Sequence, residues 1–262
     1  MSKRKITWGA WAVDQVTWQA RAAVFGAIFI LSIAGTAAVW ETAWPVARYD
    51  ALALLGVAAL TIMFALGAHS TSDALPIGLV FALGVVLELY KIETGAWMYP
   101  EGSDLAIGQK PLFVGFMYAA VASYLIRALR VKALEIRGMP PLFVAVLVGG
   151  LVYGAYFLPS QIWVRFGLIG LVTLVFWRAT LRAPSGSWLP LPVALGLAAS
   201  LIWVAENIGT FSGTWAYPND GALGLVTLSK LGAWYLLLSV CFIVVFESRR
   251  CATRRWVHTN DA

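Results

Sequence analysis

The sequence predicts an all-α membrane protein in which eight transmembrane helices form two parallel repeats of four helices. Hydrophobic residues make up 60% of the chain and charged residues only 12%, whereas soluble domains carry about 25% charged residues. The apolar residues come in runs of roughly 18 or more, the length that crosses a bilayer core. A motif containing one carboxylate also occurs twice, 118 residues apart in a chain of 262. The composition indicates a membrane protein, and the recurrence indicates a duplicated half-chain.

Eight apolar runs follow one another along the chain, bounded by prolines or charged residues. We expect spans at about 22–40, 50–68, 75–92, 111–128, 140–157, 161–178, 190–208 and 224–247. Proline costs nothing in the first turn of a helix, where its missing N–H has no partner to lose. In chain order, prolines near the starts of the second to seventh spans are Pro45, Pro76, Pro111, Pro140, Pro159 and Pro190. The corresponding units are a cytoplasmic segment 1–21, a first repeat 22–133, a second repeat 134–249 and a cytoplasmic tail 250–262.

Lysine and arginine are unevenly divided between the two sides of the predicted bundle. With an even number of spans both chain ends share one side, and that side holds fourteen of the nineteen Lys and Arg residues. Because cytoplasmic loops carry the excess of basic residues, both termini are predicted to be cytoplasmic. We therefore expect a multi-pass protein of the bacterial inner (plasma) membrane. The pI of about 9.5 does not indicate nucleic acid binding, since orientation and anionic lipid explain basic residues beside spans.

The repeated motif lies at the outer ends of the third and the seventh predicted spans. It reads Glu-x6-Gly-x-Trp-x-Tyr-Pro and runs over residues 88–100 and again over 206–218. An arginine beside aromatic residues, Arg48 or Arg165, starts the preceding span 40 or 41 residues before each glutamate. A carboxylate at the edge of hydrocarbon is costly unless it is paired. We therefore expect one Glu–Arg pair in each half, near a pseudo-two-fold axis along the membrane normal.

The residue types at these positions favour acid–base chemistry on a lipid-soluble molecule. A half-buried carboxylic acid can donate a proton, and indole and phenol faces stabilise a nearby cation. Glu88 and Glu206 are the predicted catalytic acid and base, with Glu88 preferred if only one acts, because its half carries the fuller motif. The predicted substrate-binding residues are Arg48, Trp97, Tyr99, Lys110, Tyr118, Arg165, Asn207, Trp215, Tyr217, Lys230 and Trp234, with Asp50, Lys91 and Tyr235 as further polar candidates.

The expected substrate is a polyene or isoprenoid lipid that is protonated at a C=C bond. Capture of water by the resulting cation would make the protein a hydratase, and ring closure followed by proton loss would make it a cyclase. This chemistry needs no cofactor. The chain has only two histidines, no phosphate-binding loop and no dinucleotide fingerprint, so no metal site is predicted. The expected partners are membrane lipid and a lipophilic small molecule, and not nucleic acid.

Other interpretations of the same residues stay open. Paired Glu and Arg inside a membrane also suit a transporter or permease for a small solute or lipid, in which they bind the solute or couple its movement to protons. In a non-catalytic scaffold, the ion pairs would only hold the bundle together. Trp97, Tyr99, Trp215 and Tyr217 would also suit anchoring at the membrane interface, where such residues are enriched.

The chain resembles a bacterial family of integral membrane proteins classed as a domain of unknown function. The residues that carry this resemblance are 88–100, 108–113 and 206–218. More loosely, the Glu, the Gly-x-Trp-x-Tyr loop and the following Pro-Leu resemble the membrane carotenoid hydratases and the small membrane lycopene cyclases. In the cyclases, acidic residues follow Pro-Leu, whereas here Phe113, Val114 and Gly115 follow it. The resemblance implies Glu88, Gly95, Trp97 and Tyr99 as site residues, and this difference argues against cyclase activity.

Overall fold

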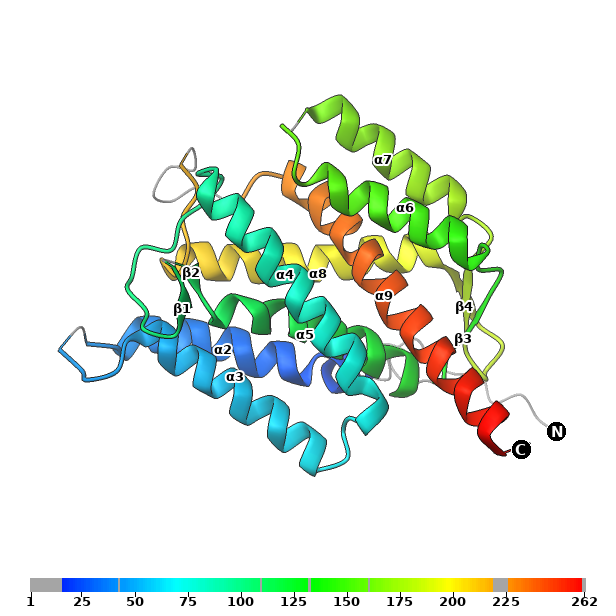
Figure 1. Cartoon of the computed structure of the whole chain (residues 1–262), viewed down its shortest axis with the longest axis horizontal. Helices are drawn as coiled ribbons and strands as arrows, with labels where there is room; N and C mark the ends of the chain where they lie inside the picture. Colours follow the sequence, from blue (N-terminus) through cyan, green and yellow to red (C-terminus); the bar gives the residue numbers. More distant parts are fainter. Residues whose placement is uncertain are drawn as a thin grey trace.

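The computed structural model describes residues 16–41, 43–108, 110–131, 133–159, 161–218 and 226–260, which are mostly helical (Figure 1). One helix overlaps each of the eight predicted ranges. These helices are α2 (Val24–Val39), α3 (Arg48–Ala65), α4 (Ala74–Glu93), α5 (Phe113–Val131), α6 (Leu142–Ala155), α7 (Ile162–Val175), α8 (Leu191–Phe211) and α9 (Ser229–Asn260). The last helix continues past the predicted domain boundary at residue 250, and most of the predicted segment 1–21 lies outside the described residues.

Not all of these helices are long enough to cross a bilayer. Among the described residues, five helices have the length and the apolar composition of a membrane span. The count becomes six if Val16–Ala22 and α2 form one span, although these two pieces meet at 74°. α6 and α7 have 14 residues each, which gives about 21 Å at about 1.5 Å per residue, against about 30 Å of hydrocarbon. The apolar helices indicate a membrane-embedded protein, but the predicted count of eight spans is not confirmed.

Short β-strands, which the sequence did not predict, pair with one another in the segments that connect the helices. β1 (Ala106–Ile107) and β2 (Lys110–Pro111) form an antiparallel pair directly before α5. β3 (Glu135–Arg137), β4 (Thr180–Arg182) and β5 (Trp188–Pro190) form a second antiparallel sheet in the order β3-β4-β5. Figure 1 shows β3 and β4 near the C-terminal end of α9, at the opposite end of the bundle from β1 and β2. This second sheet joins the α5–α6 connection to the α7–α8 connection.

Two long helices organise the packing of the others. α5 packs against α2, α3 and α4, and α9 packs against α6, α7 and α8. α9 also contacts α4 and α5, and α2 contacts α8, so the two halves of the chain share one core. Glycine permits the closest of these approaches, since a Cβ on Gly84 of α4 would lie 2.1 Å from Cγ of Tyr118 on α5.

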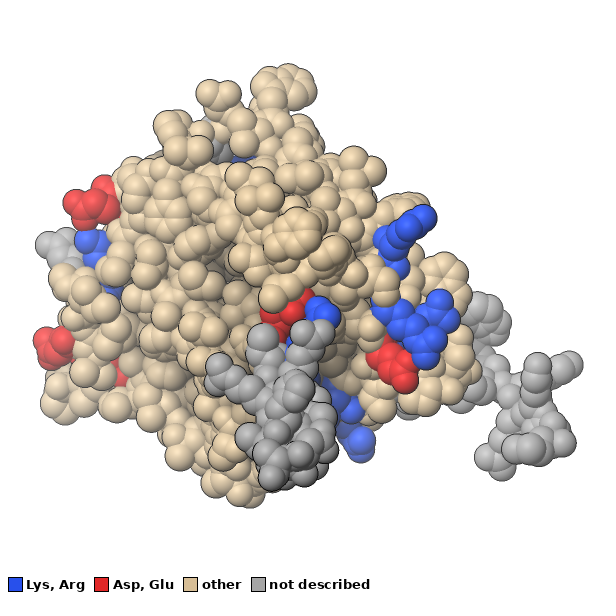
Figure 2. All heavy atoms as spheres, turned by 45° about the vertical axis from the view of Figure 1, so that its right-hand side comes forward, with Lys and Arg blue, Asp and Glu red and all other residues tan. Residues whose placement is uncertain are grey.

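The outer surface of the helices is largely uncharged. On the face that Figure 2 shows, Lys, Arg, Asp and Glu form a few small groups within a broad uncharged area. Large apolar side chains are exposed on α6 and α7, among them Phe143, Trp163 and Leu174, which are 72–78% exposed. Contiguous exposed apolar surface of this kind indicates contact with lipid or with another protein.

A charged cluster holds the end of the bundle where α4 begins. Asp73 is fully buried and accepts hydrogen bonds from the backbone N–H of Ser70 and from the Arg130 guanidinium on α5. Nδ1 of His69 lies 3.7 Å from Oδ2 of Asp73, and its Nε2 is hydrogen-bonded to the Ser123 hydroxyl at 2.9 Å. Ser70 and Asp73 form a capping box on the short 3-10 turn Thr71–Asp73 that leads into α4, and the Arg130 bond fastens this turn to α5.

Replacing this buried carboxylate tests the cluster. Asp73→Ala should lower the free energy of unfolding by about 2 kcal/mol, because it removes the capping hydrogen bond from the Ser70 N–H and the charge-assisted bond from Arg130. Thermal unfolding of the purified protein in detergent measures the effect. Glu135→Ala is the matched control, because Glu135 forms an ion pair with Arg137 on an exposed strand, where pairing contributes little. Equal melting temperatures for the two variants would contradict this role of Asp73.

Candidate functional site

The two copies of the repeated motif end their helices in the same way. α4 is followed by Gly95 at φ +68°, and α8 is followed by Gly213 at φ +66°. This left-handed conformation is open to glycine without a steric penalty, which makes glycine common just after a helix end. The next residue then donates its N–H back into the last turn, from Ala96 to Lys91 and from Thr214 to Gly209. In each copy the chain reverses and runs back over the end of its own helix.

The reversal brings the first tryptophan and tyrosine onto their own glutamate. Trp97 Nε1 donates to Oε2 of Glu88 at 2.7 Å, and the Tyr99 hydroxyl donates to the same oxygen at 3.0 Å. Tyr118 on α5 donates to the other oxygen, Oε1, at 2.9 Å. Burial raises the pKa of Tyr99 well above its ordinary value, so this phenol keeps its proton and acts as a donor. Glu88, which is only 4% exposed, is thus held by three neutral donors.

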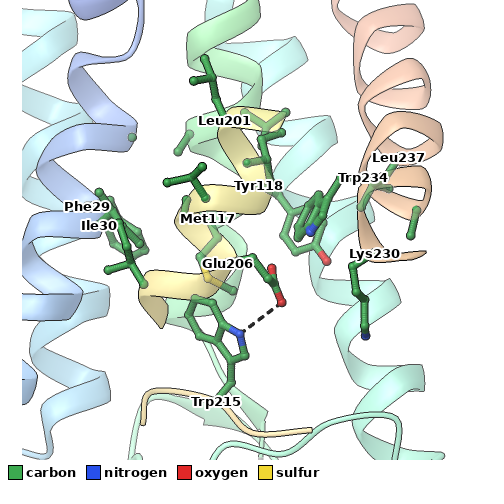
Figure 3. Close-up of a pocket in the computed structure, with 18 of the residues that line it drawn as sticks. Phe29, Ile30, Met117, Tyr118, Leu201, Glu206, Trp215, Lys230, Trp234 and Leu237 are labelled. Atoms are coloured by element: carbon green, nitrogen blue, oxygen red, sulfur yellow. Dashed lines mark hydrogen bonds between the residues drawn. The ribbon is translucent and has the colours of Figure 1, made fainter. Parts of the chain in front are cut away.

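The second copy repeats the arrangement around Glu206, which is 6% exposed. Trp215 Nε1 donates to Oε1 of Glu206 at 3.2 Å (Figure 3). The Tyr217 hydroxyl donates to the same oxygen. This carboxylate also has a cation nearby. The Lys230 ammonium lies 3.6 Å from the centre of the Tyr217 ring and interacts electrostatically with Glu206.

The two copies contact each other at equivalent positions. Met98 and Ala216, each ten residues after its glutamate, exchange two backbone hydrogen bonds of 2.9 Å in an antiparallel bridge. The rings cross over this bridge. Trp97 contacts Tyr217 edge-on at 6.0 Å between ring centres, and Tyr99 contacts Trp215 edge-on at 6.4 Å. The tryptophan of each copy therefore packs on the tyrosine of the other.

The two glutamates lie at the polar end of one cavity of about 540 Å³. Its walls are mostly apolar and come mainly from α2, α5, α8 and α9. In Figure 3, Phe29 and Ile30 approach from α2, Met117 from α5 and Leu201 from α8, with Glu206 and Trp215 below them. The volume is that of a typical small-molecule pocket. The geometry therefore combines a mostly apolar space with two carboxyl groups at one end.

The structure brings together ten of the thirteen predicted site residues. The lining of the cavity includes Glu88, Trp97, Tyr99, Tyr118, Arg165, Glu206, Trp215, Tyr217, Lys230 and Trp234. Lys91, the further candidate one turn after Glu88, also lines it. The catalytic and binding roles of these residues remain predictions.

Three predicted site residues lie elsewhere. Lys110 pairs with Glu93 at 2.7 Å, outside the cavity lining. Asn207 binds the backbone, donating to the Trp203 carbonyl and accepting from the N–H of Val226, and it fixes the segment before α9. Arg48 is the third, and its partner is described next.

The predicted pairing of Arg48 with Glu88 is wrong. Arg48 instead contacts both oxygens of Glu101, at 2.6 and 2.9 Å. The reason is that the segment after the first motif folds over the start of α3, where Asp50 accepts the N–H groups of Asp104 and Leu105. Around Glu88, tryptophan and tyrosine side chains donate the hydrogen bonds that were expected from arginine.

The contact that the structure shows for Arg165 is not with Glu206, its predicted partner. Arg165 lines the cavity and donates from Nη1 to the backbone oxygen of Ser229 at 3.1 Å. This bond fixes the guanidinium at the start of α9.

Sequence reasoning missed the apolar half of the cavity. Phe29, Ile30 and Ile33 of α2 line it, as does Tyr156 after α6. α2 is apolar along almost its whole length, so its sequence gives no periodic signal of which side faces a cavity. Tyr156 donates its hydroxyl to the Ala233 carbonyl on α9. The part of the chain that the structure describes has no cluster of three or more His, Cys, Asp or Glu that could hold a metal.

A glycine controls the position of Trp215. A Cβ on Gly209 would lie 1.9 Å from Cη2 of that indole, so Gly209→Ala should displace the ring from Glu206 and destabilise the protein by about 2 kcal/mol. Gly196→Ala on the same helix is the matched control, because nothing lies within 4 Å of its Cβ position. Thermal unfolding and tryptophan fluorescence measure both variants. A melting temperature as high for Gly209→Ala as for Gly196→Ala would refute the tight indole packing.

Comparison with known proteins identifies the family. A family model described as "Protein of unknown function (DUF817)" matches residues 13–242. The uncharacterized protein YoaT of Bacillus subtilis (strain 168) is 37% identical over 232 residues, which cover 87% of each chain. No solved structure matches this chain. With a match over most of its length and a relative of this identity, the chain belongs to the DUF817 family.

Proposed function

We propose that the protein is a membrane enzyme that binds a lipophilic, isoprenoid-type molecule in the cavity and acts on it by acid–base chemistry. The observation that carries this proposal is the position of Glu88 and Glu206 together at the polar end of a mostly apolar space. An apolar chain would bury its surface against α2 and α8, and its reactive C=C bond would lie beside the carboxyl groups. The looser resemblance to membrane carotenoid hydratases agrees with this substrate class.

The surroundings of the two carboxyl groups favour different roles for them. The three hydrogen-bond donors on Glu88 are neutral, whereas Glu206 has the Lys230 ammonium nearby. Because an ionised carboxylate in an apolar setting is costly without a cation, Glu88 is the better acid and Glu206 the better base. Glu88 gives a proton to one carbon of the C=C bond, and the cation forms on the other carbon. Water then adds to that carbon and loses its proton to Glu206, which yields an alcohol.

The aromatic rings support a cationic intermediate. The side chains of Trp97, Tyr99, Trp215 and Tyr217 lie in edge-on pairs next to both carboxyl groups. Ring faces attract cations, by about 2 kcal/mol or more where water is excluded. Lys230 already places its ammonium over Tyr217, which indicates that this group of rings accommodates positive charge.

We also propose that α2–α5 and α6–α9 are two parallel repeats and that α6 and α7 cross the membrane with the other helices. The contacts between equivalent motif residues and the matching packing of α5 and α9 support this arrangement. In Figure 1 the connections after α4 and α8 lie together at the end opposite to the C-terminal end of α9. The excess of basic residues supports an orientation in which the motif end faces outward from a bacterial inner membrane and both termini are cytoplasmic.

Replacing the proposed acid tests the enzyme. Glu88→Gln keeps the shape, and its amide oxygen can still accept the bonds of Trp97 and Tyr99, but the amide cannot transfer a proton, so formation of the product should fall by about 100-fold or more. The measurement is lipid and pigment profiling of a deletion strain complemented with each variant. Glu93→Gln is the matched control on the same helix, since Glu93 is exposed and pairs with Lys110 outside the cavity.

Other results of the same experiment would contradict the proposed enzymatic function. Identical lipid and pigment profiles in the deletion and parent strains would do so, as would full activity of Glu88→Gln. If reconstituted vesicles instead take up a solute and Glu88→Gln abolishes the pH dependence of that uptake, the protein is a transporter. If Glu88→Gln changes only the melting temperature, the site is a scaffold.

A further inference from the structure

Three cationic and two acidic side chains are among the described residues that line the cavity. Glu88 and Glu206 are its two carboxylates, and Lys91, Arg165 and Lys230 are its three cations. The carboxylates already accept hydrogen bonds from tryptophan and tyrosine. Within the described residues that line the cavity, cations therefore outnumber carboxylates by one.

Lys91 is the cation that the protein itself neutralises least. It lies on α4 three residues after Glu88, half-buried, and it experiences repulsion from Arg165. The contact that the structure shows for its ammonium is the face of Tyr90, 5.5 Å from the ring centre. Two acids that follow it in the chain are engaged elsewhere, Glu93 with Lys110 and Glu101 with Arg48. No ion pair of Lys91 occurs among the described residues.

The other two cations are held in place around the same space. Arg165 is fixed by its bond to the Ser229 carbonyl at the start of α9. Lys230, one residue further on, lies over the rings of Tyr217 and Trp97, at 3.6 and 5.4 Å from their centres. The three cations come from α4, α7 and α9, so they surround the polar end from different helices.

We infer that the ligand of this cavity is an amphiphile with an anionic head group, a phosphate or a carboxylate, held by Lys91, Arg165 and Lys230. Like charges that share a partly desolvated space repel strongly, and a bound anion removes that repulsion. Charge-assisted hydrogen bonds to such an anion are about twice as strong as neutral ones. The apolar chain extends along α2 and α8. This inference rests on the proposed function, because it names the class of molecule that the cavity binds.

Probes with one chain and different heads test the inference. Binding of octyl phosphate, octanol and inorganic phosphate to the full chain in phosphatidylcholine nanodiscs is followed by tryptophan fluorescence. We expect octyl phosphate to bind at least about tenfold more tightly than octanol, which is the effect of one charge-assisted contact. Inorganic phosphate should bind far more weakly than octyl phosphate, because it has no chain to bury. Equal affinity for inorganic and octyl phosphate would overturn the amphiphile and identify a free-anion site.

Variants locate the head group. Lys91→Gln should weaken octyl phosphate about tenfold and leave octanol unchanged, and Lys230→Gln should act in the same direction. Lys91→Arg keeps the charge and should retain binding. Lys110→Gln, outside the cavity lining, is the control and should alter neither ligand. An unchanged affinity for octyl phosphate in both Gln variants would overturn the inference.

The results that would refute this inference differ from those that would refute the proposed function. If octanol binds as tightly as octyl phosphate, the cavity takes a lipophile without an anionic head, and the proposed function stands. If neither amphiphile binds, the cavity does not take lipophilic molecules and both proposals fail.

Discussion

Two carboxyl groups buried at the edge of an apolar core are the constraint that the rest of the site satisfies. An uncompensated buried charge costs several kcal/mol, and each hydrogen bond to a charged group restores about 1.5–3 kcal/mol. The chain supplies these bonds locally, through a helix that ends at a glycine with positive φ and a strand-like segment that returns Trp and Tyr to the glutamate of the same motif. Glycine, tryptophan and tyrosine therefore recur together because each copy needs all three.

The bridge between Met98 and Ala216 makes one site out of two motifs. Its two backbone hydrogen bonds fix the register, and the ring pairs on either side follow from it. The two glutamates are held in equivalent arrangements, but their surroundings differ. Glu88 gains a third donor from Tyr118, whereas Glu206 lies near Lys230. A pair of similar acids placed in different surroundings can divide the roles of acid and base, which is how many enzymes use two carboxyl groups.

The sequence predicted the features that depend on local patterns. Apolar runs located the eight helices, and the motif located Glu88, Trp97, Glu206 and Trp215 at one cavity. The predictions were wrong where a tertiary contact determines the partner of a residue. Arg48 pairs with Glu101 because a loop folds over α3, which no local pattern indicates. The lengths of α6 and α7 and the lining contributed by α2 also depend on packing, because uniformly apolar helices give no signal of the side they present.

Cross-linking positions 98 and 216 tests the paired motifs most directly. An antiparallel pair with two hydrogen bonds places its Cα atoms about 5.5 Å apart, and both Met98 and Ala216 are exposed. In a chain whose Cys241 and Cys251 are replaced by alanine, Met98→Cys with Ala216→Cys should react with a short bifunctional thiol reagent. The two halves should then stay joined after protease cleavage between α5 and α6. Separation of the halves, at the level seen with Met98→Cys alone, would contradict the shared site.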